Sequence, residues 1–60
     1  MKTIVVCDDV EIERLLLKEI LCQYFEEINE EVSIVEYDSG ETLIADVEEG
    51  YIAMDLLFLD

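Results

Sequence analysis

The sequence has no histidine, no proline and no tryptophan, and its only cations are Lys2, Arg14 and Lys18. Against these stand 17 acidic residues, so the 60-residue chain has a formal net charge of −14. Such a charge repels nucleic-acid phosphates and anionic membranes, and we expect this segment to contact neither directly. The apolar fraction of 53% separates the chain from disordered acidic tails, which have too few apolar residues to form a core.

The two cysteines, Cys7 and Cys22, provide neither a disulfide framework nor the spacing of a zinc site. No apolar run is longer than about five residues, whereas a membrane-spanning helix needs about 20. The chain does not open with a charged stretch followed by an apolar run, as a secretion signal would. We therefore expect a cytoplasmic protein with reduced thiols.

Short apolar runs alternate with helical patterns along the chain. Residues 3–7 are β-branched and apolar without alternation, which predicts a strand buried on both faces. Residues 11–28 predict a long helix, and residues 32–37 predict a strand near a sheet edge. A second helix is expected between Asp38 and Gly50, and residues 54–59 predict a third strand.

The ends and faces of the two helices can also be predicted. Asp9 is a candidate cap for the first helix, and either Asp38 or Ser39 for the second, while Gly50 is suited to end it. In the first helix, one apolar face is expected to contain Leu17, Ile20, Leu21, Tyr24 and Ile28. Leu15 and Cys22 form a smaller apolar strip away from that face, which indicates a neighbour other than the sheet.

The alternation of strands and helices predicts an α/β fold with a parallel sheet and right-handed crossovers. The predicted elements follow the order strand-helix-strand-helix-strand. The five elements fill residues 1–60, so there is no room for a second domain.

Two of the three predicted strands end in aspartate. Asp8 and Asp9 follow the first strand, and Asp60 follows the third. Ligands of open parallel sheets bind beyond the carboxyl ends of the strands, where neighbouring strands lie about 4.8 Å apart. If the first and third strands are neighbours, three carboxylates meet there and repel one another, and a hard divalent cation would relieve the repulsion. Mg²⁺ suits such a site because it binds one or two carboxylates and keeps several waters.

These motifs resemble a known family. Val5-Val6-Cys7-Asp8-Asp9 and Leu57-Phe58-Leu59-Asp60, with Asp38-Ser39-Gly40-Glu41 between them, look like the receiver domain of two-component response regulators. The short motifs Cys-Asp-Asp and Phe-Leu-Asp are most similar to those in receivers of LytTR-type transcription regulators. The resemblance covers residues 1–60 but only the N-terminal half of a receiver. It implies an α/β, doubly wound, flavodoxin-like fold, with a parallel sheet in which the three strands lie in the order 2-1-3.

The resemblance implies a function in phosphorelay signal transduction. Asp60 matches the aspartate that accepts a phosphoryl group from a sensor histidine kinase. Asp8 and Asp9 match the acidic pair that holds Mg²⁺ together with Asp60, with Asp9 favoured as the direct ligand. The chain would then be a signalling receiver rather than a metabolic enzyme.

The resemblance also implies features that lie beyond residue 60. The family uses a Thr or Ser and a Lys at later strand ends, so residues 1–60 are expected to be a receiver truncated after its third strand. A DNA-binding output domain would follow, for transcription regulation, and homodimers on phosphorylation are a further expectation. Many relatives have an acid directly after the aspartate pair, where this sequence has Val10.

Other protein classes share parts of this pattern. An acidic metal-binding or interaction module without phosphotransfer remains the alternative. Phosphatases of the haloacid dehalogenase class carry a second Asp two residues after the first, and Val10 breaks that spacing. Dinucleotide binders need a glycine-rich turn after the first strand, which Asp8-Asp9-Val10 cannot provide. Cys7 is expected to be a core side chain, because no histidine can activate it.

Overall fold

The computed structural model describes residues 1–59, in which strands and helices follow the predicted order. The elements are β1 (Lys2–Cys7), α1 (Glu11–Glu27), β2 (Val32–Tyr37), α2 (Gly40–Glu48) and β3 (Leu56–Leu59). The clearest difference from the prediction is at β3, which begins at Leu56 rather than Met54.

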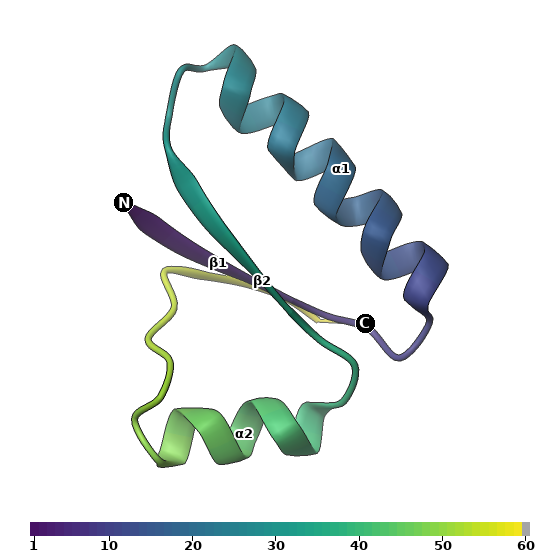
Figure 1. Cartoon of the computed structure of the whole chain (residues 1–60), viewed down its shortest axis with the longest axis vertical. Coiled ribbons are helices and arrows are strands. Elements are labelled where there is room, and N and C mark those ends of the chain that lie inside the picture. Colours follow the sequence, from purple (N-terminus) through teal and green to yellow (C-terminus); the bar gives the residue numbers. More distant parts are fainter. Residues whose placement is uncertain (60) are drawn as a thin grey trace.

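The three strands form one parallel sheet in the order β2-β1-β3. Helices α1 and α2 cover opposite faces of this sheet (Figure 1). The predicted α/β fold and the sheet order 2-1-3 are thus confirmed, and the arrangement is consistent with a doubly wound, flavodoxin-like fold. Cys7 pairs with Tyr37 on one side and with Leu59 on the other, so all three strands end at the same edge.

Strand β1 forms the centre of the core. Val5 and Val6 are fully buried and Ile4 is 1% exposed. Ile4 and Val6 pack beneath α1 against Leu21, whereas Val5 and Cys7 pack beneath α2 against Leu43. A strand that is covered on both faces needs apolar residues at every position, which explains why β1 shows no alternation.

The face that α1 presents to the sheet is narrower than predicted. Leu17, Leu21 and Phe25 pack against the core, but Ile20 and Tyr24 are each 54% exposed. Successive helical residues are rotated by about 100°, so a helix lying on a narrow sheet buries only its central strip. The neighbouring apolar flank of Tyr24 and Ile28 extends toward β3, because both residues line a hollow with Leu56.

The two ends of α1 depart differently from expectation. The prediction that Asp9 caps the helix is wrong: the residue before the first turn is Val10, and its side chain provides no capping hydrogen bond. At the other end, Asn29 has a positive φ of 59°. The Asn29 and Glu30 amides donate to the carbonyl oxygens of Glu26 and Phe25, the hydrogen-bond pattern of a Schellman motif.

Helix α2 begins and ends as predicted. The Thr42 amide donates to the Ser39 hydroxyl at 3.2 Å, so Ser39 rather than Asp38 is the cap. Gly50 follows the helix with φ +76°, a conformation that side-chain-bearing residues rarely adopt. Of the apolar residues in α2, Leu43 is buried, whereas Ile44 and Val47 are largely exposed.

Strand β3 is the least covered strand of the sheet. Leu56, Leu57 and Leu59 are exposed, and only Phe58 packs against the core beneath α1. Asp55 fixes the start of this strand, because its carboxylate accepts from the Thr3 amide and its own amide donates to the Thr3 carbonyl, both at 2.8 Å.

Candidate functional site at the carboxyl ends of the strands

Asp8 continues β1 beyond its last residue and is held from several directions. Its amide donates to the Tyr37 carbonyl oxygen at 3.1 Å, which extends the pairing of β1 with β2. Its carboxylate accepts a hydrogen bond from the Val10 amide at 2.9 Å, and this bond closes a turn of a kind that aspartate commonly makes. The residue is only 6% exposed. Asp8 is therefore an oriented carboxylate at the end of the central strand.

Asp9 differs from its neighbour in being exposed. Its carboxylate does not cap α1, and within residues 1–59 it makes no hydrogen bond or ion pair. It lines an open hollow of about 480 Å³ at the carboxyl ends of β1 and β2. Asp9 is thus free to bind a cation from solvent.

Asp38 also lines this hollow, between β2 and α2. The sequence had offered it only as an alternative helix cap, a role that Ser39 takes. Its position directly after β2, beside β1, is the signal that could have placed it at the site, since ligands bind beyond the carboxyl ends of parallel strands.

The thiol of Cys7 lies next to these carboxylates but is suited to packing. Burial raises the pKa of the Cys7 thiol, and the nearby carboxylates of Asp38 and Asp8 raise it further. The guanidinium of Arg14 acts in the opposite direction. A buried thiol kept protonated is a poor nucleophile, in agreement with the expected core role.

A cluster of charges behind the Asp8–Asp9 loop was not predicted. Glu36 on β2 accepts from Arg14 Nε at 3.2 Å and from Lys18 Nζ at 3.1 Å. The hydrogen bond from Lys18 is the largest cause that lowers the pKa of Glu36. Arg14 also donates from a terminal nitrogen to the Asp8 carbonyl oxygen at 2.8 Å. The cluster therefore ties α1 and β2 to the loop.

The donors present fit Mg²⁺ by their chemistry. Asp8 and Asp9 are hard oxygen donors, and two carboxylates suffice for a Mg²⁺ that keeps its remaining waters. Among residues 1–59 there is no group of three or more acidic, Cys or His side chains close enough to hold a metal ion. The predicted third ligand and phosphoacceptor, Asp60, lies outside the described residues, and its roles remain predictions.

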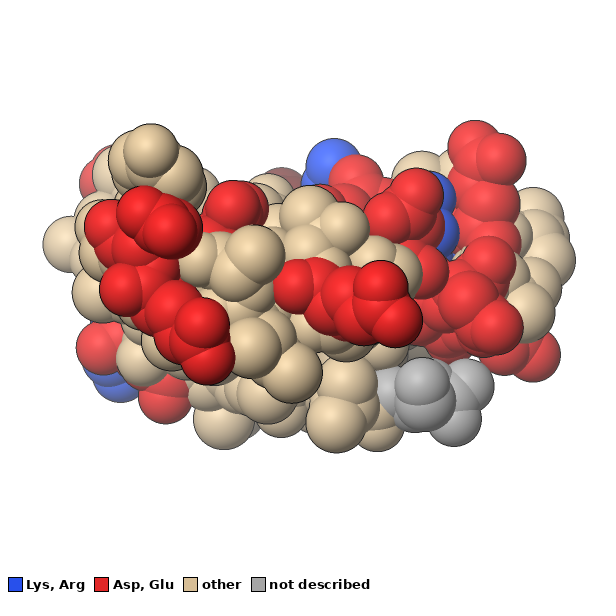
Figure 2. All heavy atoms as spheres, turned by 90° about the horizontal axis from the view of Figure 1, so that it is seen from below, with Lys and Arg blue, Asp and Glu red and all other residues tan. Residues whose placement is uncertain are grey.

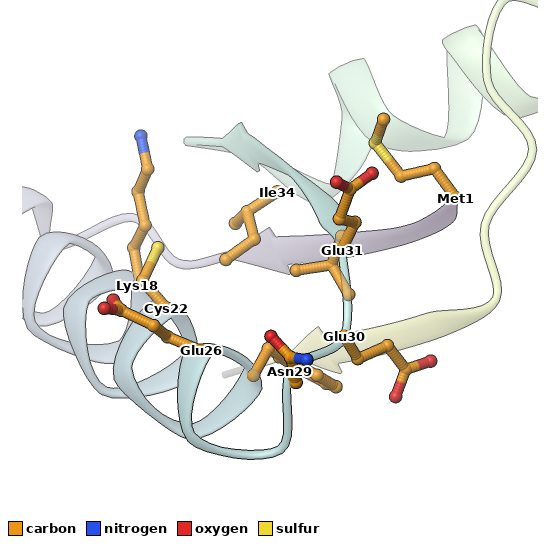
Figure 3. A pocket seen from close by; sticks show the side chains of 10 residues that line it. Met1, Lys18, Cys22, Glu26, Asn29, Glu30, Glu31 and Ile34 are labelled. Atoms are coloured by element: carbon orange, nitrogen blue, oxygen red, sulfur yellow. The ribbon is translucent and has the colours of Figure 1, made fainter.

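A larger hollow, of about 840 Å³, lies between α1 and β2 toward the amino ends of the strands (Figure 3). Lys18, Cys22 and Glu26 approach it from α1, and Ile34 approaches it from β2. Parallel α/β sheets bind ligands at the opposite edge, where the strands end. This hollow therefore gives no support to a catalytic site.

The acidic residues are not confined to the strand ends. Seen from the side covered by α2, acidic side chains are spread over the surface, and cations show only at its margins (Figure 2). Each of the three cations is in an ion pair, Lys2 with Glu30, and Arg14 and Lys18 with Glu36. Within the described part of the chain, no helix is long and apolar enough to cross a membrane.

Comparison of the chain with family models, with curated proteins and with solved structures finds no match. What the geometry establishes is a small α/β domain with a three-stranded parallel sheet and an acidic loop at the end of its central strand.

Proposed function

We propose that this chain is the phosphoacceptor part of a two-component response regulator. In this proposal Asp60 accepts a phosphoryl group from a sensor histidine kinase, and Asp8 and Asp9 hold the Mg²⁺ that the transfer requires. The proposal includes an output domain, DNA-binding in the LytTR-like interpretation, that would follow residue 60. The receiver would thereby control transcription.

One observation supports this proposal above all others. The aspartate pair follows the central strand, and the neighbouring strand on the β3 side is parallel and ends in register with it, with Leu59 opposite Cys7. The residue after Cys7 is Asp8, and the residue after Leu59 is Asp60. Asp8 and Asp60 therefore each directly follow one member of a paired set of residues on adjacent strands, as the proposal requires.

The reaction itself is a transfer between two side chains. A carboxylate oxygen of Asp60 would attack phosphorus, the bond from the kinase imidazole nitrogen to phosphorus would break, and its electron pair would return to the imidazole. Bound Mg²⁺ supplies neutralisation of charge on the phosphoryl oxygens. Asp8 is suited to a fixed ligand position because it is oriented by hydrogen bonds, and Asp9 is suited to direct binding because it is exposed.

The surface around β3 supports the idea that this is half of a larger domain. Leu56, Leu57 and Leu59 are exposed, and Tyr24 and Ile28 on α1 border the same side. Bare strand edges promote aggregation, and natural proteins cover or blunt them. We propose that later strands of a receiver pair with β3. Cys22 lines a hollow with Val32 and Ile34 of β2 instead, so it would not meet those strands.

A Mg²⁺ titration with two matched substitutions tests the site. Asp9→Asn should weaken Mg²⁺ binding most, whereas Asp55→Asn removes the same charge at the far end of β3 and should leave it unchanged. Equal losses from the two substitutions would show that cations respond to diffuse charge and would contradict the proposed site.

The second candidate is an acidic metal-binding or interaction module without phosphotransfer. The spread of acidic side chains over the α2 side of the molecule favours it (Figure 2). The two candidates differ at Asp60. If Asp60→Asn abolishes phosphoryl transfer from a kinase, the receiver is supported; if phosphoryl transfer never occurs while Mg²⁺ still binds, the second candidate is.

A further inference from the structure

We infer that Arg14 is a positioning residue for the Asp8–Asp9 cation site, with its guanidinium held in place by Glu36, which Lys18 also binds. This inference rests on the proposed function, since it assumes that the loop binds a divalent cation. It assigns a role to the charge cluster that the receiver resemblance left without one.

Arg14 connects the three parts of the molecule that meet at this loop. From the first turn of α1 it reaches Glu36 on β2 at 3.2 Å and the Asp8 carbonyl oxygen at 2.8 Å. Its side chain is only 15% exposed. The bond to the carbonyl oxygen fixes the peptide that joins Asp8 to Asp9, and this peptide determines where the Asp9 carboxylate points.

Glu36 in turn is held by two cations. Lys18, one turn along α1 from Arg14, contacts the second carboxylate oxygen at 3.1 Å. Arg14 and Lys18 are two of the three cations in the chain, and both lie at this one glutamate. Lys18 thus holds Glu36 in place, and Glu36 and the Asp8 carbonyl oxygen hold the Arg14 guanidinium from two sides.

The positive charge of Arg14 and its proposed positioning role predict opposite effects on cation binding when the residue is removed. Removing a positive charge beside an acidic site should strengthen the binding of a cation by Coulomb attraction alone. Removing a group that orients a ligand should weaken the binding, typically by tenfold or more. Lysine keeps the positive charge but lacks the planar guanidinium that reaches two acceptors. Arg14→Lys therefore tests the loss of the orienting contacts without a change of charge.

The experiment measures Mg²⁺ affinity by calorimetry, and the paramagnetic broadening by Mn²⁺ of the Asp9 and Val10 amide signals, in the full 60-residue chain. We expect Arg14→Lys to weaken Mg²⁺ binding by about tenfold and to reduce the Mn²⁺ broadening at Asp9. Glu36→Gln is a second variant in case Arg14→Lys does not fold, and it should weaken binding in the same direction. The amide signals of β1 report whether each variant is folded.

Lys2→Ala is the matched control for charge. It removes one cation from an exposed ion pair with Glu30, toward the amino end of the sheet, and should leave Mg²⁺ affinity within about twofold. Unchanged binding in both folded Arg14→Lys and folded Glu36→Gln would overturn the inference while leaving the site intact. If instead Asp9→Asn also leaves binding unchanged, the cation site itself is wrong.

Discussion

The two neighbours of β1 differ in how firmly they are held. On one side, β2 runs for six residues, the Asp8 amide extends its pairing, and Glu36 binds both Arg14 and Lys18. On the other side, β3 has four residues, three of them exposed leucines, and Asp55 provides its one side-chain hydrogen bond to β1 within the described residues.

This difference indicates where stability and function reside in the chain. The β2 side contains a complete unit of strand, helix and strand that positions Asp8 and Asp9. The β3 side leads the chain to Asp60 and exposes the apolar side chains of Leu56, Leu57 and Leu59. We therefore expect substitutions on the β2 side to change the free energy of unfolding, and substitutions on the β3 side to change association.

The largest expected effect comes from the core under α1. Leu21→Ala should lower the free energy of unfolding by about 2–5 kcal/mol, because it leaves a cavity against Ile4 and Val6. The same substitution at Leu59, which is 67% exposed, should change it by less than about 0.5 kcal/mol. Urea unfolding followed by circular dichroism compares the two variants. Similar losses from both would remove the distinction between the two sides.

Glu36→Gln should have an intermediate effect, of about 1–2 kcal/mol, because it weakens charge-assisted hydrogen bonds to Arg14 and Lys18. The pKa of Glu36 is lowered from its ordinary value of 4.5, so its contribution is present above that pH and is lost as the pH falls through the lowered pKa. Unfolding measured between pH 7 and pH 2 should therefore show a smaller loss in the variant. An acid dependence identical to that of the unsubstituted chain would show that the cluster does not stabilise the fold.

The smallest expected effect concerns the start of β3. Asp55→Ala removes the acceptor of the Thr3 amide and should cost about 0.5–1 kcal/mol or less, since the site is exposed. Hydrogen exchange should speed up in β3 before it does in β2. If β2 instead lost its protection from exchange before β3, then β2 would be the less firmly held of the two strands, contrary to the prediction.

The sequence predicted the element order and the Gly50 terminus because each depends on local patterns, and it left the cap of α2 open between Asp38 and Ser39. The sheet order joins strands that are distant in the sequence, and its prediction came from the flavodoxin-like interpretation. The sequence could not predict the Arg14–Glu36 pair, which joins a helix to a strand 22 residues away and has no spacing rule. It overestimated the buried face of α1 because periodicity marks apolar residues without showing how wide the sheet beneath them is. The prediction that Asp9 caps α1 is wrong because the sequence does not show which of the two aspartates makes the turn before the helix. In the structure, Asp8 makes this turn, through the hydrogen bond from the Val10 amide.

The measurement that tests the central proposal most directly is the location of an acyl phosphate. The protein containing residues 1–60 with the later receiver strands would be treated with acetyl phosphate and Mg²⁺, then trapped with borohydride and analysed by mass spectrometry. The receiver account predicts label on Asp60, its loss in Asp60→Asn and its retention in Asp55→Asn. Label on Asp8 or Asp9, or no label in the Mg²⁺-loaded protein, would contradict the account.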